Sequence, residues 1–203
     1  MLSGYQDKLK CITGDETWIH AYDPERTDKS SDYRAKAEAR PKRARQSHSK
    51  IKVMMTVFFD FRVVVHYEFF PPRQTVKKEY YLSTMSCLWT NNSWFLHHYN
   101  APSHTALVLP DHFVKNSTHI VPQPAYSPDL APCDFWLFPK LKEPLRRTSF
   151  ESIDEIKAES NKALMAIPEK DYLTCFEDWK IRWYKCISSR GDHFKGDKID
   201  LQE

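Results

Sequence analysis

A nearly continuous run of apolar side chains, Ile51 to Phe59, constrains the fold of this chain more than any other segment. The run is rich in valine, methionine and phenylalanine, and a second run, Val63 to Phe70, follows at a hairpin's distance. Strands that are apolar on both faces are typical of a sheet covered on both sides, as in the middle of an α/β sheet. We therefore predict an antiparallel hairpin inside such a sheet.

Further strands and a helix are expected between the amino terminus and residue 125. Short apolar strands are indicated at Lys10–Ile12, Trp94–His98 and His119–Val121. Helical spacing from Ser103 to Val114, with the serine as a suitable N-cap, predicts a helix between the last two of these strands. This order of elements favours a mixed α/β architecture.

The last third of the chain has helical periodicity. Ser152 and Glu155 form a capping-box pattern ahead of Ile156, and Pro168 is suited to open a second helix. Apolar residues then recur at helical spacing at Tyr172, Phe176, Trp179, Trp183 and Ile187. This spacing predicts a stripe that faces the core, in preference to a surface on which bases stack. Gly191 is expected to end the helix.

Length and composition bound the class of protein. The 203 residues suit one domain, and 41% apolar residues are enough for a packed core, which Trp18 and Phe135 are expected to join. The chain has no apolar run of about 18 residues or more, so no membrane partner is expected. It also has no signal-peptide pattern and no C-x-x-C motif among its five cysteines, which favours reduced thiols inside a cell.

The net charge is only +3, but it is unevenly distributed. The segment 34–52 holds eight basic residues against the single acid Glu38, and therefore carries a charge of +7. These residues are Arg34, Lys36, Arg40, Lys42, Arg43, Arg45, Lys50 and Lys52. Such a segment is a solvated loop, a surface that contacts phosphates, or a nuclear-import signal at residues 41–45. The last two readings are compatible, and together they predict a nuclear protein.

Polar residues suited to chemistry gather at three places. Asp15 follows the first predicted strand, the segment His97–His104 lies at the end of another, and Asp134 falls on the first turn of a proline-initiated helix. Ligands of α/β sheets collect beyond the carboxyl ends of strands, so Asp15 and Tyr99 are expected there. The adjacent histidines of the second segment do not predict a shared metal site, because neighbouring residues of a strand point to opposite faces.

Several segments resemble, in order, those of the mariner-family transposases. They read TGDETWIHAYDPE, RPKRARQ, HHYNAPSHTAL, YSPDLAPCDFWLFPKLK and WKIRWYKCISSRGDHFKGD. The resemblance extends from about Ile12 to Asp197, and it is close to the mariner lineage that is also fused to a histone methyltransferase in primates. It implies an RNase-H-like mixed sheet flanked by helices, with a catalytic core in residues 1–147 and a C-terminal helical extension of the same domain in residues 148–203.

The resemblance also implies three aspartates that hold two Mg²⁺ or Mn²⁺ ions. Asp15 matches the first acid and Asp134 the third. In the family 34 residues separate the last two acids, and counting back over residues 100–133 leads to Tyr99. The family motif HHDNAP reads HHYNAP here. A phenol with a pKa of about 10 is uncharged at neutral pH and is a poor ligand for these hard cations.

Three interpretations follow from the resemblance. The first is an enzyme that cleaves DNA and transfers strands, impaired because its acid triad is incomplete. The second is a non-catalytic module that keeps the fold, the basic loop and a homodimer. The third is a non-functional transposon relic. The family has two helix-turn-helix modules before its core, whereas about ten residues precede the first motif here, so DNA binding is expected to be mostly non-specific.

Overall fold

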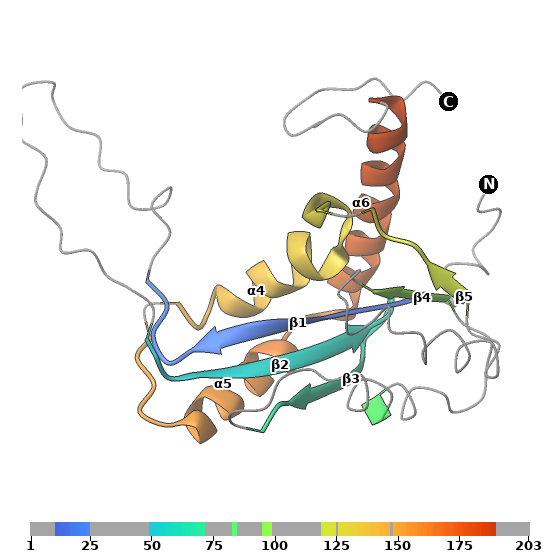
Figure 1. Cartoon of the computed structure of the whole chain (residues 1–203). Coiled ribbons are helices and arrows are strands. Elements are labelled where there is room, and N and C mark those ends of the chain that lie inside the picture. Colours follow the sequence, from blue (N-terminus) through green and yellow to red (C-terminus); the bar gives the residue numbers. More distant parts are fainter. Residues whose placement is uncertain are drawn as a thin grey trace, which may run out of the picture.

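A computed structural model describes residues 11–24, 49–71, 83–84, 95–98, 119–124, 126–146 and 148–189. Within these residues the chain forms a five-stranded sheet in the order β3-β2-β1-β4-β5 (Figure 1). The strands are β1 (Cys11–His20), β2 (Lys52–Phe59), β3 (Val64–Phe69), β4 (Phe95–His98) and β5 (His119–Val121). The predicted strands at 51–59, 63–70, 94–98 and 119–121 are confirmed to within a residue or two at each end.

The sheet is mixed, as expected for this fold class. Strands β1, β2 and β3 pair antiparallel, whereas β1, β4 and β5 pair parallel. The predicted hairpin between β2 and β3 is confirmed, and the Asp60 carboxylate holds its turn by accepting hydrogen bonds from the backbone N–H groups of Arg62 and Val63 at 2.8 and 2.9 Å. The central position of β1 follows from its pairing with β2 on one side and β4 on the other.

Strand β1 corrects the prediction of a short strand at Lys10–Ile12. It continues to His20 through the polar sequence TGDET, because β2 pairs with it from Thr13 to His20 and satisfies its backbone groups. Lys10 itself lies outside the described residues. Because this segment is polar, its sequence has no apolar run that would predict a strand. Pairing with the neighbouring strands nevertheless makes it one.

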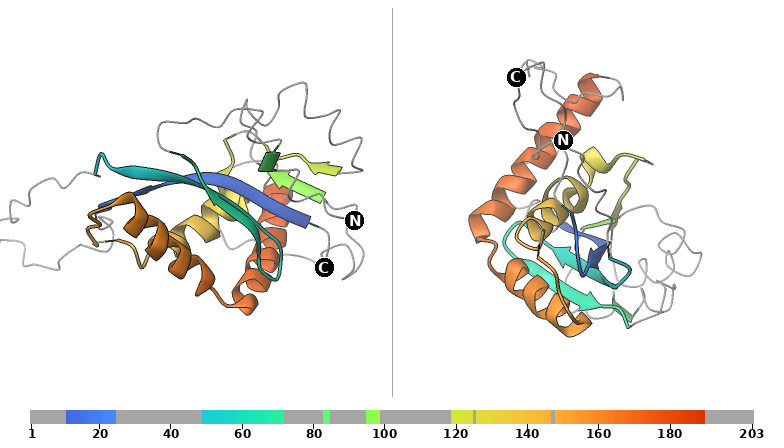
Figure 2. Two further views of the ribbon diagram at one scale, coloured as in Figure 1. Left: turned by 90° about the horizontal axis from the view of Figure 1, so that it is seen from below. Right: turned by 90° about the vertical axis from the view of Figure 1, so that its left-hand side faces the viewer.

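One face of the sheet is covered by helical elements, as Figure 2 shows from two directions. These elements are the 3₁₀-helix η1 (Pro128–Leu130), the π-helix η2 (Cys133–Leu137), α4 (Phe138–Lys142), α5 (Ile153–Met165) and α6 (Glu169–Ser188). Val53, Met55, Val57 and Phe59 alternate along β2 and pack into one core cluster with these elements. Burial of this apolar surface is the main force that holds sheet and helices together.

Both long helices start where the sequence predicted. Ser152 caps α5 by accepting a hydrogen bond from the backbone N–H of Glu155 at 3.1 Å. The Glu155 carboxylate accepts from the N–H of Glu151 at 2.7 Å, one residue before the cap, so the capping box is shifted by one position. Pro168 is the N-cap of α6, in agreement with the predicted start of the second helix.

The predicted aromatic stripe of α6 is only partly a core stripe. Tyr172, Phe176 and Trp179 are buried, and Trp183 packs against the same cluster while partly exposed. Ile187 is 69% exposed, which is a correction. The carboxyl-terminal half of α6 extends beyond the sheet in Figure 1, so the end of the stripe has no sheet beneath it. The predicted stop at Gly191 lies outside the described residues, as does the predicted helix 103–114.

Two predictions of burial were wrong. Trp18 is 38% exposed on β1, and the ammonium group of Lys52 lies 4.1 Å from the centre of its ring. Strand β3 forms the edge of the sheet and leaves Val65 41% exposed, so only β2 of the hairpin is covered on both faces. Phe135 does pack against the core cluster, as predicted. Among the described residues, no helix is both long enough and apolar enough to cross a membrane.

Candidate functional site

Asp15 lies in the middle of β1, opposite Val57 of β2. This is a correction, since it was expected beyond the end of its strand. Residues alternate along a strand, so Asp15 shares the helix-covered face with Thr13 and Thr17, which are both buried. Its side chain is half-buried, and one carboxylate oxygen accepts a hydrogen bond from the backbone N–H of Glu16 at 2.8 Å. The central strand therefore fixes the backbone that carries this carboxylate.

Asp134 lies in the first turn of η2, whose N-cap is Pro132. Its backbone N–H donates to the carbonyl oxygen of Ala131 at 2.9 Å, and Phe135 N–H donates to the same oxygen at 3.0 Å. The proline-initiated helix is thus confirmed, although its first five residues are a π-helix instead of an α-helix. Such π-helical turns are often found at functional sites.

Both carboxylates lie within electrostatic range of Cys133, which is buried in the core cluster. Burial raises the pKa of the Cys133 thiol well above its ordinary value, and the negative charges of Asp15 and then Asp134 raise it further. Both carboxylates therefore act on one buried sulfur atom, and η2 contacts β1 directly. Burial also raises the pKa of Asp134, an effect that Lys142 partly offsets. The fold thus brings the helix that carries Asp134 against the strand that carries Asp15, although the two are far apart in the sequence.

Strand β4 leads toward the second position of the predicted triad, Tyr99. It runs parallel to β1, with Thr13 opposite His97 and Gly14 opposite His98. The next residues along the two strands are Asp15 and Tyr99. The prediction that these strands are neighbours is confirmed, while Tyr99 itself lies outside the described residues.

The sequence did not predict where the side chain of His97 lies or what it contacts. It is buried at 1% exposure, and its Nδ1 shares a hydrogen bond of 3.0 Å with Oγ1 of Thr13 on β1. Its ring also meets the edge of Trp179 on α6, with ring centres 4.7 Å apart. His97 therefore joins β4 to β1 and to α6 two residues before Tyr99. The only sequence signal was a histidine next to a strand end.

Helix α6 holds the turn that precedes Asp134. The indole N–H of Trp179 donates to the carbonyl oxygen of Leu130 at 2.7 Å. The guanidinium of Arg182 donates to the carbonyl oxygen of Asp129 at 3.1 Å and lies 4.1 Å from the centre of the Phe135 ring. The sequence predicted Trp179 only as a core residue and did not single out Arg182, because periodicity within α6 carries no information on what the helix contacts.

The basic segment is described only at its end. Residues 25–48 lie outside the described part of the chain, and with them six of the eight predicted DNA-binding residues: Arg34, Lys36, Arg40, Lys42, Arg43 and Arg45. Lys50 and Lys52 are exposed beside the start of β2. The backbone pairs Ala21 with Ile51 at 2.9 Å and Ser49 with Tyr22 at 3.1 Å. The two ends of the segment between Tyr22 and Ser49 are therefore adjacent on the sheet.

The donor set fits a hard divalent cation in part. Mg²⁺ in proteins is held by one or two carboxylates together with water and substrate phosphates. Asp15 and Asp134 supply carboxylates from two elements that are in contact, and burial of Asp134 without full compensation by Lys142 is what a bound cation would relieve. Within the described ranges, no three acidic, histidine or cysteine residues are grouped so that they could hold a metal ion.

The mixed five-stranded sheet with helices on one face is an RNase-H-like fold, with one carboxylate on its central strand and a second on an adjoining helix. Residues 23–92 match the family model described as "Transposase (partial DDE domain)". The mariner Mos1 transposase of Drosophila mauritiana is 30% identical over 213 residues, which cover 96% of this chain and 60% of that protein. The histone-lysine N-methyltransferase SETMAR of Homo sapiens is 27% identical over 198 residues, or 91% of this chain and 28% of that protein.

Solved structures of Mos1 transposase also match this chain. The crystal structure of the catalytic domain of Mos1 mariner transposase has a TM-score of 0.73 and 26% identity, and the match covers 94% of this chain and 86% of that one. The Mos1 paired-end complex with Mn has a TM-score of 0.79 and 29% identity, with 92% and 57% covered; a corresponding complex with Mg matches equally well. We therefore identify the chain as a homologue of the mariner transposase catalytic domain, with its RNase-H-like fold. The chain spans about 60% of the length of Mos1 transposase.

Proposed function

We propose that this chain is a mariner-type transposase core that holds DNA through its phosphates and is impaired in strand cleavage and joining. The observation that carries the proposal is the contact of η2, which holds Asp134, with β1, which holds Asp15; the charges of both acids act on the buried Cys133 between them in the sequence. The parallel register of β1 and β4 supports the proposed impairment, because the last paired residues, Gly14 and His98, are followed in the sequence by Asp15 and Tyr99. Tyr99 then occupies the place of the second acid.

Asp15 and Asp134 are the residues that would hold Mg²⁺ or Mn²⁺, and the Mos1 complexes with these two metals support that choice of ion. When bound, the ions would activate the attacking oxygen and stabilise the leaving oxygen of a phosphodiester. The protein itself would keep the two carboxylates close together on a rigid scaffold. Strand β1 does so for Asp15, and α6 does so for Asp134 through its bonds to the preceding turn.

The impairment follows from the chemistry of Tyr99. A neutral phenol offers no formal charge to a hard cation at neutral pH. Loss of about 4 kcal/mol of transition-state stabilisation would slow the reaction by roughly three orders of magnitude. Glu16 is a poor substitute, because it neighbours Asp15 on a strand and points to the other face. Asp129 lies on η1, before the turn that carries Asp134, and matches no acid of the family motif.

DNA contact is assigned to the basic segment 34–52, with Lys50 and Lys52 at its described end. Lysine and arginine side chains that neutralise phosphates bind DNA without regard to its sequence. The same segment supports a nuclear location through the basic cluster at residues 41–45. A second candidate function is a DNA-binding module without any chemistry, and the substitution at Tyr99 favours it.

A nicking assay on supercoiled plasmid with Mn²⁺ tests the proposal. The unmodified chain should give no nicked product above background, while Tyr99→Asp should give Mn²⁺-dependent nicking that is lost in Tyr99→Asp/Asp15→Ala. Calorimetric titration should show tighter Mn²⁺ binding to Tyr99→Asp, by about tenfold or more, since the added carboxylate is a charged ligand.

Two outcomes would contradict the proposal. Nicking by the unmodified chain that disappears in Asp15→Ala would mean that Tyr99 does not disable the site. A Tyr99→Asp variant that melts cooperatively but neither nicks DNA nor gains affinity for Mn²⁺ would mean that Tyr99 does not stand in the metal site. In that case the module without chemistry becomes the better description.

A further inference from the structure

Strand β3 forms one edge of the sheet, since among the described strands it pairs only with β2. The backbone N–H of Phe70 donates to the carbonyl oxygen of Met54 at 2.9 Å, which makes these two residues a hydrogen-bonded pair. Such pairs alternate along an antiparallel ladder. Glu68 therefore also bonds to β2, whereas the backbone groups of Tyr67 and Phe69 point outward from the sheet. An outward row of this kind is a template for a further strand.

Half-buried apolar side chains line this edge on the helix-covered face of the sheet. Tyr67 and Phe69 pack against the margin of the core cluster, and their rings meet edge to face with centres 6.3 Å apart. Val64 continues the row at the start of β3 and packs against the same cluster. A strand added beside β3 would therefore place alternate side chains against an apolar row.

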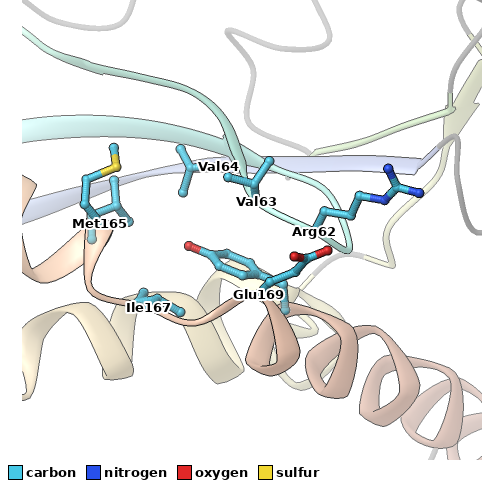
Figure 3. A pocket seen from close by; sticks show the side chains of 8 residues that line it. Arg62, Val63, Val64, Met165, Ile167 and Glu169 are labelled. Carbon is cyan, nitrogen blue, oxygen red and sulfur yellow. The ribbon is translucent and has the colours of Figure 1, made fainter.

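A pocket of about 310 Å³ opens at the start of β3, where the hairpin turn meets the connection from α5 to α6 (Figure 3). Its lining is mostly apolar and includes Val63, Val64, Met165 and Ile167. Val63 and Met165 are 53% and 56% exposed. The volume is at the small end of the range for ligand pockets and is enough for one large aliphatic side chain. Exposed apolar groups around a hollow are typical of an interaction site.

Opposite charges mark the two ends of this edge. The side chain of Glu68, near the end of β3, is 45% exposed. Arg62, in the turn before β3, is exposed and lies at one end of the pocket, with its guanidinium pointing away from the apolar side chains (Figure 3). Glu169 borders the same end, but it begins α6, where the positive end of the helix dipole offsets its charge. A strand antiparallel to β3 would be matched by a base beside Glu68 and an acid beside Arg62.

We propose that β3 and this pocket bind an extended segment of a partner protein as an additional strand, antiparallel to β3. The segment has a base near its start, apolar residues at alternate positions and an acid at its end. Tyr67 and Phe69 exchange backbone hydrogen bonds with it, and its last apolar side chain fills the pocket beside Val64. The charges set its direction, because a parallel strand would put the base beside Arg62. None of these residues belongs to the candidate metal site, so the proposal is independent of the catalytic one.

A fluorescein-labelled peptide of sequence GVKVTLEG, blocked at both ends, is the probe. Its lysine lies opposite Glu68, its second valine opposite Tyr67, its leucine at the pocket and its glutamate beside Arg62. Fluorescence anisotropy measures its binding to the full chain. Interfaces below about 1,200 Å² are typical of transient contacts, so a dissociation constant on the order of 10–100 µM is expected.

N-methylation of the peptide tests the backbone pairing. The second valine donates its N–H to the carbonyl oxygen of Tyr67, so a methyl group on that nitrogen should weaken binding by about tenfold or more. The matched control carries the methyl group on the next residue, threonine, whose N–H points away from β3, and its affinity should change by less than about twofold. Amide exchange followed by nuclear magnetic resonance should show slower exchange at Tyr67 and Phe69 in the complex, and no change at Glu68.

Substitutions in the protein test the charges and the pocket. Arg62→Glu should weaken binding of GVKVTLEG by about tenfold and should instead prefer GVKVTLKG, in which lysine replaces the glutamate. Lys185→Glu, in the last turn of α6, makes the same change in net charge away from the pocket and should leave both affinities unchanged. Met165→Lys puts a charge into the pocket and should weaken binding, whereas Leu173→Lys, at a 40% exposed position outside the lining, should not.

Each outcome bears on the proposal once circular dichroism has shown that the variants are folded. Loss of affinity on N-methylation opposite Tyr67 alone, together with the exchanged preference of Arg62→Glu, supports the added strand. No binding at about 1 mM peptide overturns it, since a site of the expected affinity would be nearly saturated there. Equal effects of the two methyl groups would mean that the peptide does not pair with β3. An Arg62→Glu variant that treats both peptides alike would overturn the antiparallel, charge-matched arrangement.

Discussion

Trp179 and Leu130 are joined by a hydrogen bond of 2.7 Å from the indole N–H to the backbone carbonyl oxygen, and both residues are buried. The same indole meets the ring of His97 on β4. Trp179 therefore connects the strand that leads to Tyr99 with the turn that leads to Asp134. One side chain of α6 thus contacts both β4 and the turn that precedes Asp134.

Trp179→Phe should lower the free energy of unfolding by about 2–4 kcal/mol, because it leaves a buried carbonyl group unpaired and removes part of a buried ring. Trp18→Phe is the control, since Trp18 is 38% exposed on β1 and should cost less than about 1 kcal/mol. Urea denaturation followed by circular dichroism measures both values. Equal losses in the two variants would mean that the bond to Leu130 contributes nothing to stability.

Gly14 should not tolerate a side chain. A Cβ at this position would overlap the ring of Phe58, which lies opposite Gly14 on β2 and is buried. Gly14→Ala should therefore destabilise the fold by roughly 1–3 kcal/mol through overpacking. Phe58→Ala removes the ring atoms that would overlap, so the double variant should lose less stability than the sum of the two single variants. Additive losses in a double-mutant cycle would place the cost elsewhere.

Tyr172 should make the fold sensitive to alkaline pH. Burial, with a smaller effect of Asp171, raises the pKa of Tyr172 from 10.0 to about 12. The folded state therefore favours the neutral phenol. The contribution of Tyr172 to the stability of the fold is complete below pH 10.0 and is lost as the pH rises toward about 12. Tyr172→Phe should lack this loss, and by about pH 11 the two proteins should diverge by about 1 kcal/mol relative to pH 8. Urea denaturation at the two pH values measures the difference, and parallel behaviour would contradict the prediction. Other buried ionisable groups, such as Cys11, act equally in both proteins.

Neutralising three residues of the basic segment should weaken DNA binding for every sequence alike. Lys42→Gln/Arg43→Gln/Arg45→Gln should reduce the slope of log affinity against log salt by up to about 2.7, since each phosphate contact contributes about 0.9. Fluorescence anisotropy with a labelled duplex and its scrambled counterpart measures both slopes. The matched control removes three positive charges from α5 and α6 by Lys157→Gln, Lys162→Gln and Lys170→Gln. A control that loses as much affinity would mean that net charge, and not this segment, carries the binding.

Much of the fold could be predicted from local patterns. The hairpin of β2 and β3 followed from two apolar runs with a short gap, because both strands carry their signal within a few residues. The starts of α5 and α6 followed from Ser152 and Pro168, since capping depends on residues that are next to one another in the sequence. For the candidate site, Asp15, Tyr99 and Asp134 were identified through their motifs, and the spacing between the last two was part of that resemblance.

Other features depended on which surfaces meet. The extension of β1 to His20, the exposure of Trp18 and the exposure of Ile187 all differ from what local periodicity predicted. A polar segment becomes a strand when neighbouring strands on both sides satisfy the hydrogen bonds of its backbone. An apolar residue of a helix stays exposed when that helix extends beyond the sheet. Such outcomes are set by pairing and packing partners, which periodicity does not specify.

The amino-acid sequence by itself determined the chemical inventory of this protein: two carboxylates and a tyrosine in motif positions, a basic segment, and strands and helices whose local patterns are strong. Only the tertiary structure decided that Asp15 and Asp134 share the surroundings of Cys133, and that Trp179 braces the turn before Asp134. These contacts join residues that are far apart in the sequence. Their formation must offset the entropy of closing long loops, and only burial in a common core does so.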